Sequence, residues 1–227
     1  MKIPRFASTI LRRLFPKYPS DPRRRFRRIY EKNLFGGKES RSGPGSSMEQ
    51  TQVLRKELRA LLERLAVNSL LDAPCGDCNW MRAADLGAVT YTGVDIVPEL
   101  IEANRTRFAS RGIRFMVADL SRDPLPRADL IFCRDCLVHL PFEQIRACLV
   151  NFLESGATYL MATTFTATQL NQDLEPGAIW RPLNMERAPF CFPPPEYLLF
   201  EQCTEDSGRY PDKSMGVWRL SDLKPLR

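Results

Sequence analysis

Residues 70–80 read Leu70-Leu71-Asp72-Ala73-Pro74-Cys75-Gly76-Asp77-Cys78-Asn79-Trp80. The segment 69–72 is typical of a short buried strand. The turn after it contains Gly76, which lets the backbone pass close to a ligand that a side chain would block. In doubly wound sheets, ligands bind beyond the carboxyl ends of the strands, where the direction of the chain across the sheet reverses. This stretch therefore predicts a strand followed by a ligand-binding loop.

Short apolar runs alternate with helical patterns on both sides of this loop. Strands are predicted at 69–72, 89–96, 113–117, 129–133 and 157–164, and two further strand-like runs at 197–203 and 214–220. One helix is predicted after Ser46, where Glu49 completes a capping-box pattern, and a second from Pro98 to about Ser110. A third is predicted to end at Gly156. Strands that alternate with helices predict an α/β fold with a parallel sheet covered on both faces.

Acids end the second and third predicted strands as well as the first. Asp95 follows Gly93-Val94 and stands where a carboxylate can accept both hydroxyls of a ribose, and Asp119 follows Val117-Ala118. Three acids at three successive strand ends suit a nucleoside better than a dinucleotide. The alternative is that these acids cap the following helices, most readily at Asp119, where the next residues form a turn.

A pyrophosphate does not suit the first loop. It would need a G-x-G-x-x-G pattern and an uncrowded helix N-terminus, and Pro74, Asp77 and Cys78 provide neither. The carboxylate of Asp77 would also repel a phosphate group. A cationic nucleoside without phosphate avoids this conflict.

The first loop resembles that of the class I S-adenosylmethionine-dependent methyltransferases. Their motif reads acid-x-Gly-x-Gly-x-Gly, and here it reads Asp72-x-Pro74-x-Gly76-x-Cys78, so two of the three glycines are replaced. The resemblance covers about residues 46–165. Together with Gly43-Pro44-Gly45-Ser46 upstream and Trp80 downstream, this motif resembles the sequences of a bacterial subgroup of these methyltransferases whose substrate is unassigned.

The resemblance implies the fold, cofactor and activity. It implies a Rossmann-like three-layer sandwich of about seven mostly parallel strands, with a C-terminal antiparallel pair. The cofactor would be S-adenosyl-L-methionine. The protein would be an enzyme that transfers a methyl group to an oxygen or nitrogen of a small-molecule or glycan-like acceptor.

The resemblance also implies which residues contact the cofactor. The first loop would hold the methionyl part, the second strand end the ribose and the third the adenine. The fourth strand end would line the sulfonium side through backbone groups. In chain order the residues so implied are Asp72, Ala73, Cys75, Gly76, Trp80, Asp95, Ile96, Asp119, Leu120, Cys133 and Arg134.

His139 and Asp135 are the candidate catalytic residues, because both follow the fourth predicted strand. His139, the only histidine, could face the transferring methyl group and act as a general base, and Asp135 is a rival for base or substrate anchor. Two alternatives stay open. His139 could be a packed, hydrogen-bonded side chain, and positioning alone could drive an in-line displacement without a base.

The seven cysteines include two C-x-x-C pairs, Cys75 with Cys78 and Cys133 with Cys136. Four thiolates would suit structural zinc, but the two pairs lie farther apart in sequence than in a zinc ribbon and occupy loops assigned to the cofactor. We therefore expect buried thiols and no metal. An odd number of cysteines, with no secretory signal expected, favours a reducing compartment.

Charge and composition divide the chain. Residues 1–30 contain ten Lys and Arg against Asp21 alone, whereas residues 31–227 carry a net charge of −3. We expect a basic, partly helical N-terminal extension over 1–45 and a methyltransferase domain over 46–227. Within that domain, the proline-rich segment 166–197 would be a substrate-side excursion or lid.

The basic leader leaves several functions open. It could contact RNA or an anionic membrane surface weakly, remain a solvated arm, or act as an organelle transit peptide. A catalytically silent cofactor-fold module that docks RNA or membrane through this leader is the main alternative, and an NAD-dependent oxidoreductase is a third. No run is apolar enough to span a bilayer, so we expect a cytoplasmic protein, peripheral at most at the inner membrane surface.

Overall fold

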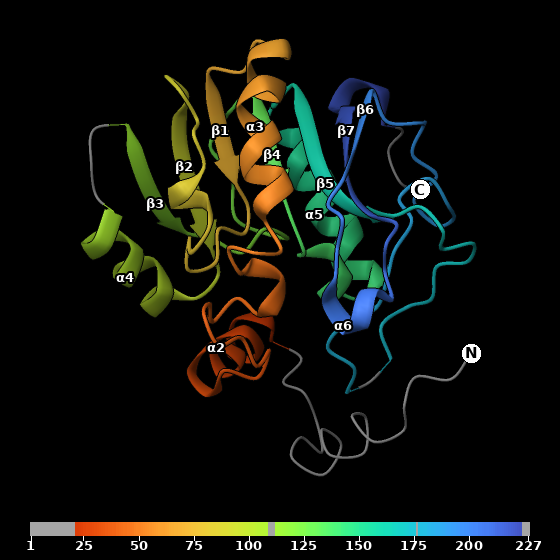
Figure 1. The fold of residues 1–227 in the computed structure, drawn as a ribbon, viewed down its shortest axis with the longest axis horizontal. Helices are drawn as coiled ribbons and strands as arrows, with labels where there is room; N and C mark the ends of the chain where they lie inside the picture. Colours follow the sequence, from red (N-terminus) through yellow and green to blue (C-terminus); the bar gives the residue numbers. More distant parts are fainter. Residues whose placement is uncertain (1–20, 109–111, 176, 224–227) are drawn as a thin grey trace.

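The computed structural model describes residues 21–108, 112–175 and 177–223. Residues 1–20 of the predicted N-terminal extension therefore lie outside the described residues. Within them, seven strands form one sheet in the order β3-β2-β1-β4-β5-β7-β6 (Figure 1). Their bounds are β1 Ser69–Asp72, β2 Thr90–Asp95, β3 Ile113–Val117, β4 Leu130–Cys133, β5 Tyr159–Phe165, β6 Tyr197–Phe200 and β7 Lys213–Arg219.

The chain changes direction across the sheet after β3. Strand β1 pairs in parallel with both β2 and β4, so β3 and β2 lie on one side of it and β4 and β5 on the other. The carboxyl ends of β1, β2 and β4 consequently meet at one edge, which is where ligands bind in such sheets. Strand β7 is antiparallel to both β5 and β6, so it alone runs against the others among the described strands.

Helices cover both faces, which confirms the predicted three-layer sandwich. On one face α3 (Gln52–Arg64) and α4 (Pro98–Phe108) bury apolar side chains against the sheet, and on the other α5 (Phe142–Glu154) does so. The remaining helices are α2 (Pro22–Lys32) and the single turn α6 (Glu205–Gly208). None of the helices in the described residues combines the length and hydrophobicity needed to cross a bilayer.

The predicted capping box at Ser46 is wrong, although the helix that follows it is confirmed. Ser46 ends a short 3-10 turn that begins at Pro44, and α3 begins at Gln52. The reason is local: the backbone N–H of Ser46, which the side chain of Glu49 would accept in a capping box, donates to the backbone oxygen of Gly43 at 3.1 Å. The predicted apolar face is present, with Leu54, Leu58 and Leu62 buried.

The segment 166–197 packs into the core. Leu183 and Met185 are fully buried, and the guanidinium of Arg181 donates to the backbone oxygens of Leu137 and Leu140. Its Trp180 ring packs edge-on against other aromatic rings. None of its described residues lines the pocket described below, which is instead covered by residues from 22–46.

Candidate active site

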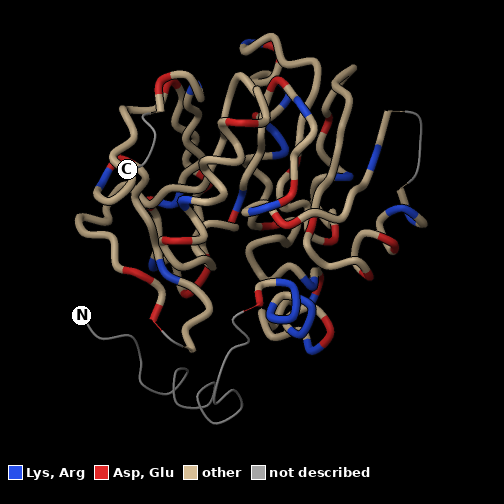
Figure 2. Tube along the Cα trace, turned by 180° about the vertical axis from the view of Figure 1, so that it is seen from behind, with Lys and Arg blue, Asp and Glu red and all other residues tan. Residues whose placement is uncertain are grey.

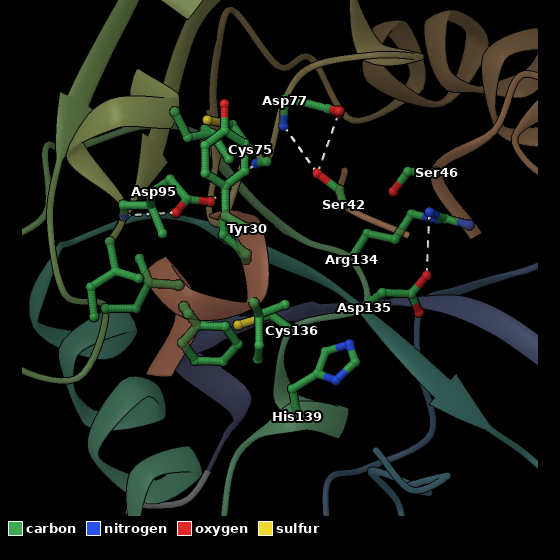
Figure 3. Close-up of a pocket in the computed structure, with 18 of the residues that line it drawn as sticks. Tyr30, Ser42, Ser46, Cys75, Asp77, Asp95, Arg134, Asp135, Cys136 and His139 are labelled. Carbon is green, nitrogen blue, oxygen red and sulfur yellow. Dashed lines mark hydrogen bonds and ion pairs between the residues drawn. The ribbon is translucent and has the colours of Figure 1, made fainter. Parts of the chain in front are cut away.

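One pocket lies at the carboxyl ends of β1, β2, β3 and β4, beneath the N-terminal residues (Figure 3). All of the predicted site residues except Ala73 and Cys133 line it. Those two side chains are buried in the hydrophobic core, and the backbone N–H of Ala73 donates to Phe132 at 2.8 Å. The three acid-bearing strand ends are therefore brought together as the sequence predicts.

Position 76 in the first loop favours glycine for two reasons, its backbone conformation and the lack of space for a side chain. Gly76 has φ +53°, in the left-handed region that favours glycine. A Cβ added there would lie 2.2 Å from Oγ of Ser42. The close approach thus comes from the N-terminal segment, a neighbour that sequence reasoning did not identify.

Asp95 ends β2 as a buried carboxylate on the pocket wall. Its Oδ1 accepts the backbone N–H of Val97 at 3.0 Å and its Oδ2 that of Gly76 at 3.2 Å. Burial raises the pKa of Asp95 to about 6, and these backbone hydrogen bonds oppose the rise. The carboxylate is therefore mostly ionised at neutral pH, and since a carboxylate has about four lone-pair positions, it can accept further hydrogen bonds.

Asp72, at the end of β1, is more strongly perturbed. Burial raises its pKa to about 7, although the hydroxyl of Tyr91 donates to its Oδ2 at 2.6 Å and lowers it. The negative charge of Asp95 adds to the rise. Two buried acids thus face one pocket; the charge of Asp95 disfavours ionisation of Asp72, and the guanidinium of Arg134 favours it. A cationic ligand between them would relieve this repulsion.

Asp119, at the end of β3, forms the expected turn and also lines the pocket. Its Oδ1 accepts the backbone N–H and the hydroxyl of Ser121, at 2.9 and 2.6 Å, which is the turn expected from the sequence. Asp119 and Leu120 nevertheless line the pocket, as does Ile96 after β2. The turn therefore does not remove this carboxylate from the site.

Asp77 fastens the N-terminal segment onto the glycine loop. Its carboxylate accepts the hydroxyl of Ser40 at 2.8 Å, the N–H of Arg41 at 2.8 Å and the hydroxyl of Ser42 at 3.3 Å. Ser42 Oγ in turn accepts the N–H of Asp77 at 3.0 Å. The sequence offered only a weak signal for this contact, a serine-containing loop far from residue 77.

The N-terminal cover consists of α2 and the loop to Ser46. Phe26, Ile29 and Tyr30 of α2 line the pocket, with Phe35 beyond the helix. The basic face of α2, visible below the domain in Figure 2, makes contacts within the chain. Arg27 forms a 2.5 Å ion pair with Glu99 of α4.

A buried ion-pair cluster lies beside the β4 end of the pocket. Arg134 forms a 2.6 Å ion pair with Glu201, and Lys213 forms one of 2.6 Å with Asp135. Burial alone would raise the pKa of Asp135, but the positive charges of Lys213 and Arg134 outweigh it and hold that pKa well below its ordinary value. Asp135 is therefore a permanent anion at neutral pH. Glu201 and Lys213 lie on or next to β6 and β7, and no sequence pattern linked them to the site.

His139 is held as a neutral imidazole. Burial lowers its pKa to about 4, although its hydrogen bond to the backbone oxygen of Ile179 opposes this. That bond joins Nδ1 to the oxygen at 2.5 Å, so Nδ1 carries the proton and Nε2 is the acceptor. The ring also stacks against Phe35, with centroids 4.8 Å apart. His139 is therefore packed and hydrogen-bonded, and it also lines the pocket, whereas its role as a base stays a prediction.

The four cysteines of the two C-x-x-C pairs are buried at the ends of β1 and β4, as the sequence predicts. Cys75 and Cys78 lie near Tyr91, whose hydroxyl is 3.3 Å from Sγ of Cys78. Burial raises the pKa of the Cys75 thiol well above its ordinary value, with Cys78 adding to the rise. The pKa of the Cys133 thiol is raised as well, first by its hydrogen bond with Cys136 and then by burial. Across the described residues, no three His, Cys, Asp or Glu side chains gather as metal ligands would.

These donors and acceptors fit a cationic nucleoside. Ribose hydroxyls need an acceptor, which the buried carboxylate of Asp95 supplies with lone pairs to spare. The pairing of Asp72 with Asp95 favours positive charge, and Asp77 beside them disfavours phosphate. The residues present therefore suit S-adenosylmethionine and do not suit a dinucleotide.

Comparison with known proteins agrees with this geometry. Residues 70–155 match a family model described as a methyltransferase domain. The chain is similar in structure to the 1,6-didemethyltoxoflavin-N1-methyltransferase of Burkholderia thailandensis, at 16% identity and TM-score 0.61, over 96% of this chain and 91% of that one. The N-methyltransferase NodS of Bradyrhizobium japonicum WM9 matches at 18% identity and TM-score 0.51, over 78% and 96%.

The same fold also occurs in a protein named for another reaction. The [4+2]-cyclase SpnF matches at 18% identity and TM-score 0.52, over 74% of this chain and 70% of that one. The chain spans just under two thirds, 66%, of a bacterial CtHen1-CN methyltransferase-domain structure. No curated protein sequence matches the chain significantly.

Strand order and the comparisons together define the fold. The chain has the fold of the class I methyltransferases, and over residues 70–155 it is similar to a methyltransferase domain.

Proposed function

We propose that this protein transfers the methyl group of S-adenosylmethionine to an oxygen or nitrogen of a small-molecule or glycan-like acceptor bound next to Asp135 and His139. The observation that carries the proposal is the position of Asp95, a buried, mostly ionised carboxylate at the end of β2 that faces the pocket. The matched solved structures include two that are named as N-methyltransferases, which supports a small acceptor.

Each strand end has a proposed task in holding the cofactor. Asp95 accepts the ribose hydroxyls, Ile96 and Leu120 contact the adenine, and Asp119 receives its amino group. Asp72 and the backbone at Gly76 hold the methionyl part, with Cys75 and Trp80 beside it. When bound, the cofactor supplies an electrophilic methyl group on a sulfonium.

The chain itself orients the acceptor and excludes water. Phe26 and Phe35 of the N-terminal cover shield the pocket, and the backbone oxygen of His139 accepts from the guanidinium of Arg25 at 3.2 Å. This contact joins the cover to the acceptor side. Holding two reacting groups in line contributes as much as about 7–11 kcal/mol to such a displacement, so no dedicated base is needed.

Calorimetric titration tests the cofactor site directly. The wild type should bind S-adenosylmethionine and S-adenosylhomocysteine, and Asp95→Asn should bind both about ten- to a hundred-fold more weakly, because hydrogen bonds to a charged group contribute about 1.5–3 kcal/mol. Asp85→Asn is the matched control, since that acid is exposed and paired with Arg59 outside the pocket. Absence of binding by the wild type would refute the proposal.

A catalytically silent module that docks RNA or membrane is the second candidate. It is favoured by the exposed guanidinium groups of Arg23, Arg24 and Arg28 on α2, and by the occurrence of this fold in a cyclase. Asp95→Asn separates the two candidates. It should abolish methyl transfer under the first, and leave binding to RNA or phosphatidylserine vesicles unchanged under the second.

A further inference from the structure

Two cationic side chains line the pocket among the described residues, Arg41 and Arg134. Arg41 belongs to the N-terminal cover and is exposed, and its guanidinium donates to the backbone oxygens of Tyr30 and Glu31 at 3.2 and 3.4 Å. Arg134 directly follows β4, and its side chain is only 4% exposed. The buried cation of the pocket wall is therefore Arg134, and its side chain has no task yet in the proposed function.

The guanidinium of Arg134 is held from one side only. Its Nε and Nη2 donate to the carboxylate of Glu201, at 3.2 and 2.6 Å. Its Nη1 donates no hydrogen bond to any residue within 21–108, 112–175 or 177–223. This nitrogen lies 3.3 Å from Oδ2 of Asp135, but that oxygen already accepts from Nζ of Lys213 at 2.6 Å. Of the five N–H donors of this group, the two on Nη1 are therefore left for a ligand.

Arg134 lies where the N-terminal cover meets the ion-pair cluster. Figure 3 shows it between Asp135 and Ser46 of the cover. The cover does reach this cluster, because a Cβ added at Gly45 would lie 3.3 Å from Oδ2 of Asp135. Ser46 lines the pocket too, and its hydroxyl has no hydrogen-bond partner in the described part of the chain. A second free donor thus lies on the same side of the pocket.

An acid stands next to this cation at the edge of the sheet. Strands β1 and β4 are parallel neighbours with Asp72 opposite Phe132, so Arg134 lies only two residues beyond that pair. Asp72 and Arg134 both line the pocket. Burial raises the pKa of Asp72 to about 7, and the positive charge of Arg134 is near enough to oppose this rise. The pocket therefore offers an acid and a cation side by side.

The amino-acid end of S-adenosylmethionine matches such a pair, because it carries an ammonium and a carboxylate on one carbon atom. The ammonium suits Asp72, which holds the methionyl part in the proposed function. The carboxylate then needs a cation, since burying a charge without a partner is costly. Hydrogen bonds from a guanidinium to a carboxylate are about twice as strong as those between neutral groups. Nη1 of Arg134 can donate such bonds.

We infer that Arg134 binds the carboxylate at the amino-acid end of the cofactor, with Ser46 beside it, and that this contact makes the site specific for cofactors that retain the carboxylate. The inference rests on the proposed function. Glu201 then acts as a positioning residue, because it orients the guanidinium without lining the pocket itself.

Two ligands that differ only in the carboxylate test the inference by calorimetry on the full chain. They are S-adenosylhomocysteine and its decarboxylated form, the aminopropyl thioether of adenosine. The wild type should bind the first about ten- to a hundredfold more tightly than the second. The double variant Arg134→Met with Glu201→Leu removes both charges of the buried pair, so neither is left without its partner. In this variant the preference should fall to within about threefold, and the decarboxylated ligand should keep its wild-type affinity.

Two control variants separate Arg134 from other cations. Arg219→Met with Glu196→Leu removes an ion pair that lies outside the pocket and is more than a third exposed, and it should leave both affinities unchanged. Arg41→Gln removes the other cation that lines the pocket, and the preference for the carboxylate should remain. Loss of the preference in Arg41→Gln would assign the carboxylate to Arg41 and would overturn the inference.

The remaining outcomes separate this inference from the proposed function. If S-adenosylhomocysteine binds the wild type without preference for the carboxylate, or the preference survives the double variant, the inference is wrong and the cofactor site stands. Equal weakening of both ligands in the double variant would mean that Arg134 only supports the fold, and would also overturn the inference. If neither ligand binds the wild type, the inference and the proposed function both fail.

A single variant protects the test against misfolding. If the double variant does not fold, Arg134→Lys decides, because it keeps a cation for Glu201 but lacks the planar fork of donors. The preference for the carboxylate should then fall by about threefold or more. An unchanged preference would contradict the inference.

Discussion

Glu201→Gln should destabilise the protein more than any exposed ion pair could. The carboxylate of Glu201 accepts from Nε of Arg134 at 3.2 Å and from Nη2 at 2.6 Å, and it lies 3.6 Å from Nζ of Lys213. Breaking a buried ion pair on one side costs about 3–5 kcal/mol, because the remaining charge stays buried. We expect about 3 kcal/mol, the lower end, since Asp135 still faces both cations.

The assay is reversible denaturant or thermal unfolding, with Glu196→Gln as the control. Glu196 pairs with Arg219 at 2.7 Å on the same edge of the sheet, but both side chains are more than a third exposed, so its loss should cost about 0–1 kcal/mol. In a chain of this size, 3 kcal/mol corresponds to about 6–12 °C in Tm. Equal effects of Glu201→Gln and Glu196→Gln would refute the reasoning.

Three further predictions follow from the site. His139, the only histidine, should titrate with a pKa of about 4 by proton NMR. Because this pKa lies below the unfolded value of 6.5, the contribution of His139 to stability is complete above pH 6.5 and is lost as the pH falls toward 4. A measured pKa near 6.5 would contradict this prediction. Gly76→Ala should lower both Tm and S-adenosylhomocysteine affinity, whereas the double variant with Ser42→Gly should recover part of each. Asp77→Ala should accelerate hydrogen exchange at Arg41 and weaken the cofactor site, and unchanged exchange there would show that the N-terminal segment is held by other contacts.

Sharing a fold with methyltransferases does not by itself establish methyl transfer. SpnF, a matched structure, is named as a cyclase. The acceptor side of the pocket therefore matters more for function than the sheet does, because sites rather than folds carry chemistry.

The sequence predicted what depends on local pattern. Alternation of apolar runs with helical periods was sufficient for all seven strands, and acids placed directly after strands identified Asp72, Asp95 and Asp119 as neighbours, since parallel strands end at one edge. The predicted capping box at Ser46 is absent because the backbone N–H of Ser46, which the pattern assumes free for Glu49, donates to Gly43 in a short 3-10 turn.

Only the tertiary structure decided what depends on long-range contact. The order of β6 and β7 brings Glu201 and Lys213 into ion pairs with Arg134 and Asp135, which line the pocket. The residues that cover the glycine loop come from the N-terminal cover and not from the proline-rich segment. It also decided the charge states, because desolvation and neighbouring charges make Asp135 a permanent anion and His139 a neutral base. A residue's type is written in the sequence, but its burial and its charged neighbours exist only once the chain has folded.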